Sequence, residues 1–474
     1  MQKMSTVFHS PKMGRIKQIH FIGIGGAGMC GIAEVLLNEG YRISGSDLSE
    51  NKALTRLRDL GAAITIGHYA DNVEHADVVV RSTAIKEDNP EIQAAYVKMI
   101  PVIPRAAMLA ELMRFRYGIA ISGTHGKTTT TSLVSSLLTE GGLDPSFVIG
   151  GKLTSSGTNA QLGTSQYFVA EADESDASFL FLKPMIAVVT NIDADHMETY
   201  QSSFDQLRKT FLEFLHHLPF YGLAVLCIED HEIRRILPLV QRPTLTYGFR
   251  DGAHYRAVNW NQQGLLSTFE VHRPAPHGVL NIQFKWPGRH NVLNALAAIA
   301  IATELGLDDD SIIKGLYHFA GVGRRFQILG ERKFERGNAL IVDDYGHHPR
   351  EIKATIDALR AVWPNKRLIH IFQPHRYTRT RDLFNDFIDV LQLGDELLLL
   401  DIYAAGEQPI AGISSEALCQ EMNAIYPKAR VVTEQNLEEH LNGLIESNDV
   451  ILAQGAGSIS NIINQLVQRD KHYD

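Results

Sequence analysis

The chain has 474 residues, of which 45% are hydrophobic and 21% are charged, and its formal net charge is −9. At roughly 100–200 residues per domain, this length predicts two to four domains, each able to bury a core without disulfide bonds. The negative charge argues against a broad nucleic-acid-binding surface, which requires clustered lysine and arginine. The three cysteines form no C-x-x-C pair, so we expect neither a disulfide framework nor a zinc site.

Neither end of the chain nor its interior carries a membrane signal. The N-terminal segment is basic but lacks the apolar stretch of a signal peptide. The longest apolar stretch, 295–307, is interrupted by Thr303 and Glu304 and therefore predicts a buried helix, not a membrane span. We expect a cytoplasmic protein with no membrane insertion, and the few cysteines fit a reducing compartment.

The first third of the chain alternates between apolar runs and amphipathic segments. A strand at 19–23 is followed by glycines and a helix at 29–38, and further strands are predicted at 42–46 and 78–81 around a helix at 52–60. This alternation predicts a parallel, doubly wound sheet. Pro101 and Pro104 then interrupt the pattern, and 106–116 is predicted to be a connecting helix.

Two further βα series follow. The second has strands at 117–122, 167–171, 185–191 and 223–227, helices at 128–140 and 290–305, and antiparallel strands expected within 230–287. The third follows Gly321, Gly323 and Arg324–Arg325 and has strands at 339–343, 368–372, 396–401 and 450–453. We therefore predict an α/β protein of three domains: a Rossmann-like domain at 1–107, a P-loop ATPase-like domain with a mostly parallel sheet at 108–322, and a Rossmann-like domain at 323–474.

A glycine-rich turn joins the first strand to its helix. Residues 23–28, Gly-Ile-Gly-Gly-Ala-Gly, fit G-x-G-x-x-G, and Asp47 follows at the distance expected of a ribose-binding acid. Such glycines let backbone N–H groups approach a diphosphate at a helix N-terminus. The motif fits an NAD-dependent dehydrogenase, a protein that binds a UDP-sugar, or a tight turn without a ligand.

The second strand–helix junction carries a phosphate-binding loop. Residues 123–130 read Gly-Thr-His-Gly-Lys-Thr-Thr-Thr, so Lys127 is expected near the β- and γ-phosphates, and Thr128 near Mg²⁺. The loop is shorter than the G-x-x-x-x-G-K-[ST] pattern, because Ile121 stands where that pattern has its first glycine. An incidental turn with an exposed lysine is the alternative.

Acidic residues follow two neighbouring strands of the second series. Glu171, Asp173 and Glu174 end one strand, and Asp193, Asp195 and His196 follow another. Because ligands bind at the carboxyl ends of parallel strands, these side chains could hold Mg²⁺ beside a triphosphate. The alternative for Glu171 and His196 is a helix cap.

With these motifs the chain resembles the Mur ligase family, whose members join amino acids to UDP-muramyl precursors of peptidoglycan. The resemblance covers essentially the whole length. It rests on seven segments in the order of the family: G-I-G-G-A-G-M at 23–29, G-T-H-G-K-T-T-T at 123–130, E-A-D-E-S-D at 171–176, N-I-D-A-D-H at 191–196, G-R-H-N-V-L-N-A at 288–295, D-D-Y-G-H-H-P at 343–349 and Q-P-H-R-Y-T-R-T at 373–380.

The resemblance implies a set of site residues. Asn291 resembles the residue that hydrogen-bonds adenine. Asn294 lies three positions later on the same helix face, so it could either bind the nucleotide or be a packing amide. The implied sets are catalytic Lys127, Glu171, His196 and Arg325; metal-binding Thr128, Glu171 and His196; ATP-binding Gly123, Thr124, His125, Gly126, Lys127, Thr128, Thr129, Asn291, Asp343 and Tyr345; and UDP-sugar-binding Gly25, Gly26, Ala27, Gly28, Met29, Ser46, Asp47 and Thr83.

The amino-acid site is implied to contain His347, His375, Arg376 and Arg379. Arginine suits a carboxylate because its N–H groups can bind both oxygens, and Arg376 and Arg379 would share a face if their segment is helical. Several related ligases carry a carbamylated lysine that bridges two metals. Phe211 aligns with that lysine here, so we predict no carbamylation and leave open how a second Mg²⁺ is held.

Within the family, the first turn and the segments at 343–349 and 373–380 resemble the alanine-adding member. This implies ATP-dependent ligation of L-alanine to the lactyl carboxylate of UDP-N-acetylmuramic acid, through an acyl phosphate and with Mg²⁺ or Mn²⁺. We expect a monomer or weak homodimer. The alternatives are a ligase that recycles muropeptides by adding a preformed peptide, an NAD-dependent oxidoreductase, a P-loop switch and a nucleotide-sensing module.

Overall fold

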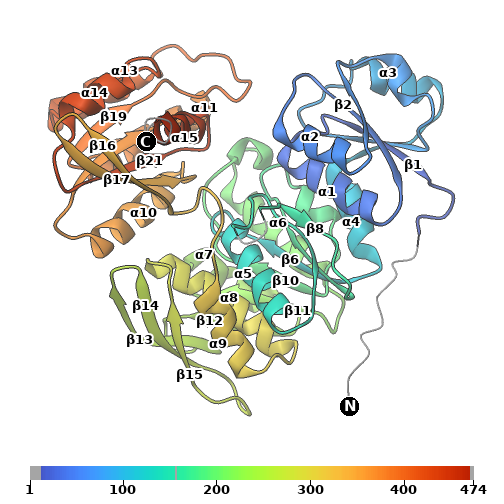
Figure 1. Cartoon of the computed structure of the whole chain (residues 1–474). Coiled ribbons are helices and arrows are strands. Elements are labelled where there is room, and N and C mark those ends of the chain that lie inside the picture. Colours follow the sequence, from blue (N-terminus) through green and yellow to red (C-terminus); the bar gives the residue numbers. More distant parts are fainter. Residues whose placement is uncertain (1–11, 155–156, 470–474) are drawn as a thin grey trace. The chain divides into compact units, whose positions relative to one another are not determined.

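The computed structural model describes residues 12–154 and 157–469 and contains three separate sheets of five, ten and six strands (Figure 1). The predicted three-domain α/β class is confirmed. The described residues group into two compact units. The first contains the chain up to Asn259, together with Phe269–Gln283 and Leu293–Ala320. The second contains Trp260–Thr268, Phe284–Val292 and the residues from Gly321 on. The predicted domain boundaries remain predictions.

The N-terminal sheet has the order β3-β2-β1-β4-β5, and all its pairs are parallel. Chain order reverses beside β1, so the turn after β1 lies where ligands bind in doubly wound sheets. Asn51 caps α2 by accepting from the N–H groups of Ala53 and Leu54. The elements are β1 (Gln18–Ile22), α1 (Ala27–Asn38), β2 (Arg42–Asp47), α2 (Lys52–Asp59), β3 (Ala63–Ile66), β4 (Val78–Arg81), α3 (Pro90–Val97), β5 (Val102–Pro104) and α4 (Arg105–Arg114).

The central sheet has the order β15-β14-β13-β12-β11-β10-β6-β9-β7-β8. Within 230–287, where antiparallel strands are expected, β12 instead pairs in parallel with β11 and with the start of β13. β13 and β14 are joined by two residues, a connection that antiparallel neighbours allow and parallel ones do not, and β7 pairs antiparallel with β8. The elements are β6 (Tyr117–Ser122), α5 (Lys127–Glu140), β7 (Ser146–Val148), β8 (Ala160–Gln161), β9 (Tyr167–Glu171), β10 (Ile186–Val189), α6 (Phe204–His216), β11 (Leu223–Cys227), α7 (His231–Ile236), β12 (Thr244–Gly248), β13 (Tyr255–Gln263), β14 (Leu266–His272), β15 (Leu280–Phe284), α8 (Arg289–Glu304) and α9 (Asp309–His318).

The C-terminal sheet has the order β16-β17-β21-β18-β19-β20, in which only β16 is antiparallel to its neighbour. The elements are β16 (Gln327–Phe334), β17 (Gly337–Asp344), α10 (Pro349–Val362), β18 (Arg367–Phe372), α11 (Tyr377–Asp382), α12 (Phe384–Leu391), β19 (Glu396–Leu399), α13 (Ser415–Ile425), β20 (Ala429–Val431), α14 (Leu437–Leu444), β21 (Asp449–Gln454) and α15 (Ile459–Arg469).

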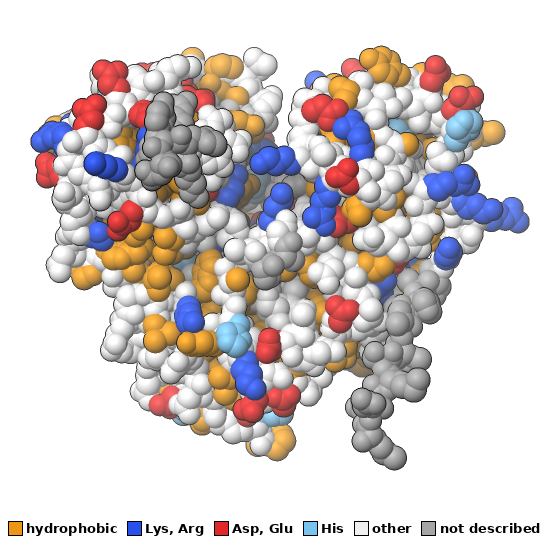
Figure 2. Space-filling model, in the orientation of Figure 1, with side chains coloured by type: hydrophobic (Ala, Val, Ile, Leu, Met, Phe, Trp, Pro, Cys, Tyr) orange, Lys and Arg blue, Asp and Glu red, His pale blue; other side chains and the backbone are white. Residues whose placement is uncertain are grey.

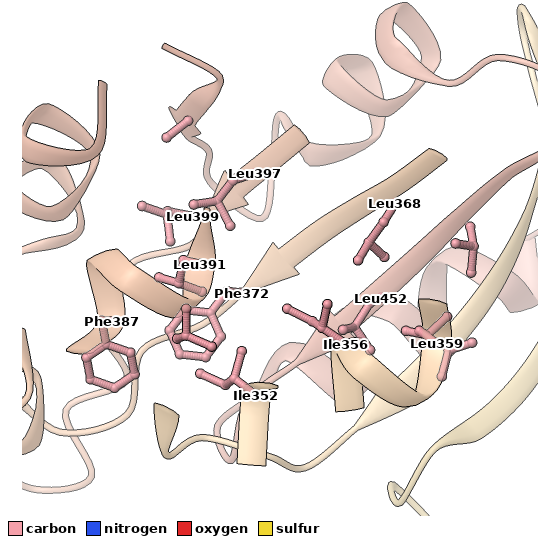
Figure 3. Packing of buried hydrophobic residues seen from close by; sticks show 14 of the residues in the cluster. Ile352, Ile356, Leu359, Leu368, Phe372, Phe387, Leu391, Leu397, Leu399 and Leu452 are labelled. Atoms are coloured by element: carbon pink, nitrogen blue, oxygen red, sulfur yellow. The ribbon is translucent and has the colours of Figure 1, made fainter. Parts of the chain in front are cut away.

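Helices cover both faces of this last sheet. On one face, Ile352 and Ile356 of α10 and Phe387 of α12 pack against Phe372 and Leu452 of the strands (Figure 3). A second buried cluster on the other face includes residues of α14 and α15. Each fully buried side chain of this size contributes roughly 1.5–3 kcal/mol, so the two cores hold the strand ends in fixed positions.

No helix in the described ranges is long and apolar enough to span a bilayer. On the face seen in Figure 2, lysine and arginine side chains are interspersed with acidic and uncharged ones.

Candidate active site

The glycine-rich turn is tied to the end of β2. The N–H groups of Gly23 and Ile24 donate to the carbonyl of Ser46 at 2.9 and 3.0 Å, and Gly25 N–H donates to Asp47 Oδ2 at 2.8 Å. A Cβ atom on Gly28 would lie 2.2 Å from Nη1 of Arg105, so a larger residue there would displace the Arg105 side chain. Asp47 therefore supports the turn directly, a contact that the ribose interpretation did not include.

The remaining residues of the predicted UDP-sugar set differ in their positions. Ala27 begins α1 directly after Gly26, Met29 is buried, and Thr83 is exposed after β4. Ser46 is fully buried, and its hydroxyl donates to Oε2 of Glu91 at 2.7 Å. The Ser46 hydroxyl is therefore bound within the protein, and the assignment of Ser46 to the UDP-sugar site remains a prediction.

Glu91 is the centre of a buried polar network that the sequence analysis missed. His68 Nδ1 lies 3.0 Å from Glu91 Oε2, and Asn72 donates to Glu91 Oε1. Burial opposes the charge of Glu91, but hydrogen bonds from His20, Ser46 and Asn72 hold its pKa below the usual value. The network fixes β2, α3 and the segment after β3 beneath the turn.

The phosphate loop is held by residues that follow β10. Thr124 N–H donates to the carbonyl of Asn191 at 3.2 Å, and His125 N–H donates to Asn191 Oδ1 at 2.9 Å. Thr190 Oγ1 donates to the carbonyl of His125 at 2.6 Å. Gly126, with φ +83°, precedes the first residue of α5. These bonds hold the loop in one conformation. The sequence analysis missed this role of Thr190 and Asn191 because it depends on a tertiary contact with the loop.

Lys127 makes its bonds within the loop and with one acid. Its Nζ donates to the carbonyls of Gly123 and Thr124 at 2.7 and 3.1 Å, and lies 3.0 and 2.8 Å from Oε1 and Oε2 of Glu174. Burial raises the pKa of Glu174 to about 7, although Lys127 opposes this shift. Burial opposes the charge of Lys127, but Glu174 and Asp173 outweigh it and raise the pKa of the ammonium.

Strand register gathers the predicted metal ligands at one edge. Glu171 pairs with Ile121, and Val189 pairs with Ser122, so the phosphate loop begins between the ends of β9 and β10. A Cβ atom on Gly150 would lie 2.6 Å from Glu171 Oε2, so the Glu171 carboxylate lies directly against Gly150. The Thr128 hydroxyl and the Glu171 carboxylate are hard oxygen donors that suit Mg²⁺, and the His196 imidazole also suits Mn²⁺.

Three further side chains each have a partner within the protein: Asn294, Asn291 and Phe211. Thr130 Oγ1 donates to Asn294 Oδ1 at 3.2 Å, so Asn294 packs against α5. Asn291 is buried, and its Nδ2 donates to the carbonyl of Pro287 at 2.8 Å. Phe211 is fully buried, with its ring centroid 5.2 Å from that of Phe179, and so belongs to the core.

In the second unit, two arginines lie over one tyrosine. The guanidinium carbons of Arg324 and Arg325 are each 4.8 Å from the ring centroid of Tyr345. Asp343 is fully buried, its carboxylate accepts from the Ser460 hydroxyl, and burial raises its pKa. The predicted contact of Asp343 with a ribose remains a prediction.

The predicted amino-acid residues lie together in this unit. The rings of His347 and His375 are 5.7 Å apart, and Arg379 Nη1 lies 3.3 Å from His375 Nδ1. The condition under which Arg376 and Arg379 would share a helical face is not met, because Arg376 precedes α11 with φ +72° and ψ 137°. The backbone turns at Arg376 because its N–H bonds to Tyr403 instead of continuing a helix.

Three family models match the sequence. They are described as Mur ligase family, catalytic domain, over residues 18–117; Mur ligase middle domain, over 121–302; and Mur ligase, glutamate ligase domain, over 324–457.

Curated and solved relatives agree with these matches. The UDP-N-acetylmuramate--L-alanine ligase of Legionella pneumophila (strain Philadelphia 1) is 69% identical over 98% of this chain and 99% of its own length. Among solved structures, the UDP-N-acetylmuramate-alanine ligase of Thermotoga maritima is 30% identical, with a TM-score of 0.82 over 97% of this chain and 100% of its own. A murein peptide ligase of Psychrobacter arcticus 273-4, 23% identical, shares the fold with a TM-score of 0.71 over 95% of this chain and 98% of its own.

Proposed function

The chain belongs to the Mur ligase family, and we propose that it forms an amide between L-alanine and the lactyl carboxylate of UDP-N-acetylmuramic acid. The reaction consumes ATP and releases ADP and phosphate. The observation that carries the proposal is the identity with alanine ligases along nearly the whole chain, together with a phosphate loop at the carboxyl edge of the central sheet.

The chemistry requires activation of a carboxylate, because oxide is too poor a leaving group for direct attack by an amine. A lactyl carboxylate oxygen attacks the γ-phosphorus, and the bond from that phosphorus to the ADP oxygen breaks. The alanine nitrogen then attacks the carbonyl carbon of the acyl phosphate. The tetrahedral intermediate expels phosphate, and the nitrogen loses its proton to give the amide.

The protein supplies charge and position for the first step. Phosphoryl transfer between two anions depends on neutralisation of charge, and Lys127 and Arg325 are the cations that we assign to it. Thr128, Glu171 and His196 would hold Mg²⁺ or Mn²⁺, which neutralises charge on the triphosphate when bound. No covalent enzyme nucleophile is needed.

The same proposal assigns the substrates to three regions. The turn at Gly25 to Gly28 receives the diphosphate of the sugar nucleotide, with Asp47 and Thr83 beside it. The loop at Gly123 to Thr129, with Asn291 and Tyr345, binds ATP. His347, His375, Arg376 and Arg379 bind L-alanine. These substrates place the reaction in the cytoplasm, and the predicted monomer or weak homodimer remains a prediction.

The test is phosphate release from ATP and Mg²⁺ with UDP-N-acetylmuramic acid, with and without L-alanine, followed by mass spectrometry of the sugar nucleotide. Release that depends on alanine, with a product heavier by one alanyl residue, supports the proposal. Release with a muramyl peptide but not with alanine would replace it with the recycling reaction. Hydride transfer to or from a nicotinamide cofactor without phosphate release would replace it with an oxidoreductase.

A further inference from the structure

The segment that follows β19 is hydrogen-bonded to the loop that carries His375 and Arg376. Tyr403 N–H donates to the carbonyl of Pro374 at 2.8 Å, and Arg376 N–H donates to the carbonyl of Tyr403 at 2.9 Å. His375 and Tyr403 form an isolated parallel bridge. These bonds continue the pairing of β18 with β19 beyond both strand ends, so residues 403–407 are fixed against the loop.

The Tyr403 side chain covers one of the predicted alanine-binding residues. Its ring is nearly parallel to that of His375, with an interplanar angle of 11° and centroids 5.5 Å apart. Tyr403 is nevertheless 42% exposed, so the ring is not simply part of the core. The tyrosine thus restricts the orientation of the imidazole from one side.

Arg376 combines backbone strain with an unused donor. Its φ of +72° with ψ of 137° is sparsely populated by residues other than glycine. The bond to Tyr403 and a 2.8 Å bond from Thr380 Oγ1 to the Arg376 carbonyl hold this conformation. Nε of Arg376 is buried and has no hydrogen-bond partner within the described part of the chain. A buried donor of this kind has a high cost unless an acceptor, such as a carboxylate, binds to it.

Glu407 lies beside the same guanidinium. Its Oε2 accepts from Thr378 N–H at 3.0 Å, and its Oε1 accepts from Thr378 Oγ1 at 2.7 Å. Nη1 of Arg376 is 3.8 Å from Glu407 Oε1. The carboxylate is therefore held by the first turn of α11 and attracts one end of the Arg376 side chain, which is 41% exposed as a whole.

Resting on the proposed function, we propose that Tyr403 and Glu407 are positioning residues of the amino-acid site. Tyr403 holds the His375 ring and the strained Arg376 backbone. Glu407 orients the half-exposed Arg376 guanidinium so that it can bind the carboxylate of L-alanine. Both residues act through others, and neither takes part in the phosphoryl transfer.

The test compares Michaelis constants for the three substrates in Tyr403→Ala, Tyr403→Phe and Glu407→Gln, with Tyr221→Ala as a matched exposed-tyrosine control. Loss of an aromatic pair or of an orienting charge predicts a rise of about fivefold to tenfold in the KM for L-alanine. The KM values for ATP and the sugar nucleotide should stay unchanged. Tyr403→Phe keeps the ring and should resemble the unmodified protein, as should Tyr221→Ala.

A parallel rise in all three KM values, or no change in any, would overturn the inference, because a general packing role predicts the first and no role predicts the second. If Tyr403→Ala fails to fold, Tyr403→Leu keeps apolar bulk without the ring and should show the same selective rise. If the unmodified protein used a peptide instead of L-alanine, the proposed function would fall. The KM ratio measured with that peptide would still decide the roles of Tyr403 and Glu407.

Discussion

Nζ of Lys127 lies 2.8 Å from Oε2 of Glu174, and the two side chains are 17% and 5% exposed. In this state the lysine is neutralised by a protein carboxylate and its three donors are bound by oxygens of the chain. A bound triphosphate therefore competes with Glu174 for the ammonium. Glu174 belongs to the E-A-D-E-S-D segment at 171–176. Its ion pair with Lys127 could not be predicted because it depends on the contact between α5 and the segment after β9.

We predict that Glu174→Gln binds ATP more tightly and folds less stably. The amide keeps the shape but removes the competing charge, so the Kd for a non-hydrolysable ATP analogue should fall by up to about tenfold, equivalent to roughly 1.4 kcal/mol. Breaking this pair leaves Lys127 with only the neighbouring charges of Asp173 and Glu171, so the loss of stability should not exceed the roughly 3–5 kcal/mol of an uncompensated buried charge. Calorimetric binding and thermal melting measure the two effects, and an unchanged Kd would count against the competition.

Lys127→Met should abolish most turnover. Removing one preorganised donor to developing charge typically costs about 10²–10³ in kcat. The KM for the sugar nucleotide should be unaffected, because its predicted turn belongs to another sheet. Lys209→Met removes an exposed lysine of α6 and serves as the control. Equal activity of the two variants would remove Lys127 from the mechanism.

Asp47→Ala should weaken binding of the sugar nucleotide selectively. The carboxylate accepts from Gly25 N–H at 2.8 Å and so fixes the turn. A hydrogen bond to a charged group contributes roughly 1.5–3 kcal/mol, which predicts a rise in KM of about tenfold or more with the KM for ATP unchanged. Asp59→Ala, an exposed acid at the end of α2, is the matched control. A rise in both KM values would indicate general damage to the fold.

His370 should make stability depend on pH. It is fully buried in β18, and burial lowers its pKa to about 4. The unfolded chain binds a proton near pH 6.5 that the folded chain excludes, so stability falls as pH decreases from 6.5 towards 4. Between pH 6.5 and 5 the expected loss is about 2 kcal/mol.

Urea unfolding at pH 7 and pH 5 measures this dependence. His370→Gln removes the titrating group and should lose less stability over the interval than the unmodified protein. His272→Gln changes an exposed histidine and should keep the original dependence. The same dependence in all three proteins would exclude His370 as its source.

Much of the fold could be predicted because buried parallel strands leave a strong signal. The strand expected at 78–81 coincides with β4, and those expected at 117–122 and 223–227 coincide with β6 and β11. The short strands β7 and β8 were missed because two or three residues give no measurable periodicity. The parallel pairing of β12 was missed because pairing direction depends on neighbours that the local pattern does not specify.

The candidate site also has parts that could be predicted from local sequence and parts that depend on tertiary contacts. The phosphate loop was predictable because its residues are adjacent in sequence. The hydrogen-bond partners of Ser46, Asp343 and Arg376 could not be predicted because they come from distant segments: Glu91, Ser460 and Tyr403, respectively. Sequence motifs therefore predicted the type of reaction, whereas the residues that orient the site could be identified only from the tertiary structure.

The most direct test of the proposed mechanism uses UDP-N-acetylmuramic acid with ¹⁸O in both oxygens of the lactyl carboxylate. After turnover with ATP and L-alanine, mass spectrometry of the released phosphate reports where those oxygens go. An acyl phosphate predicts one labelled oxygen in each phosphate and one in each amide product. Phosphate without label would contradict the account, because the carboxylate would then not have attacked the γ-phosphorus.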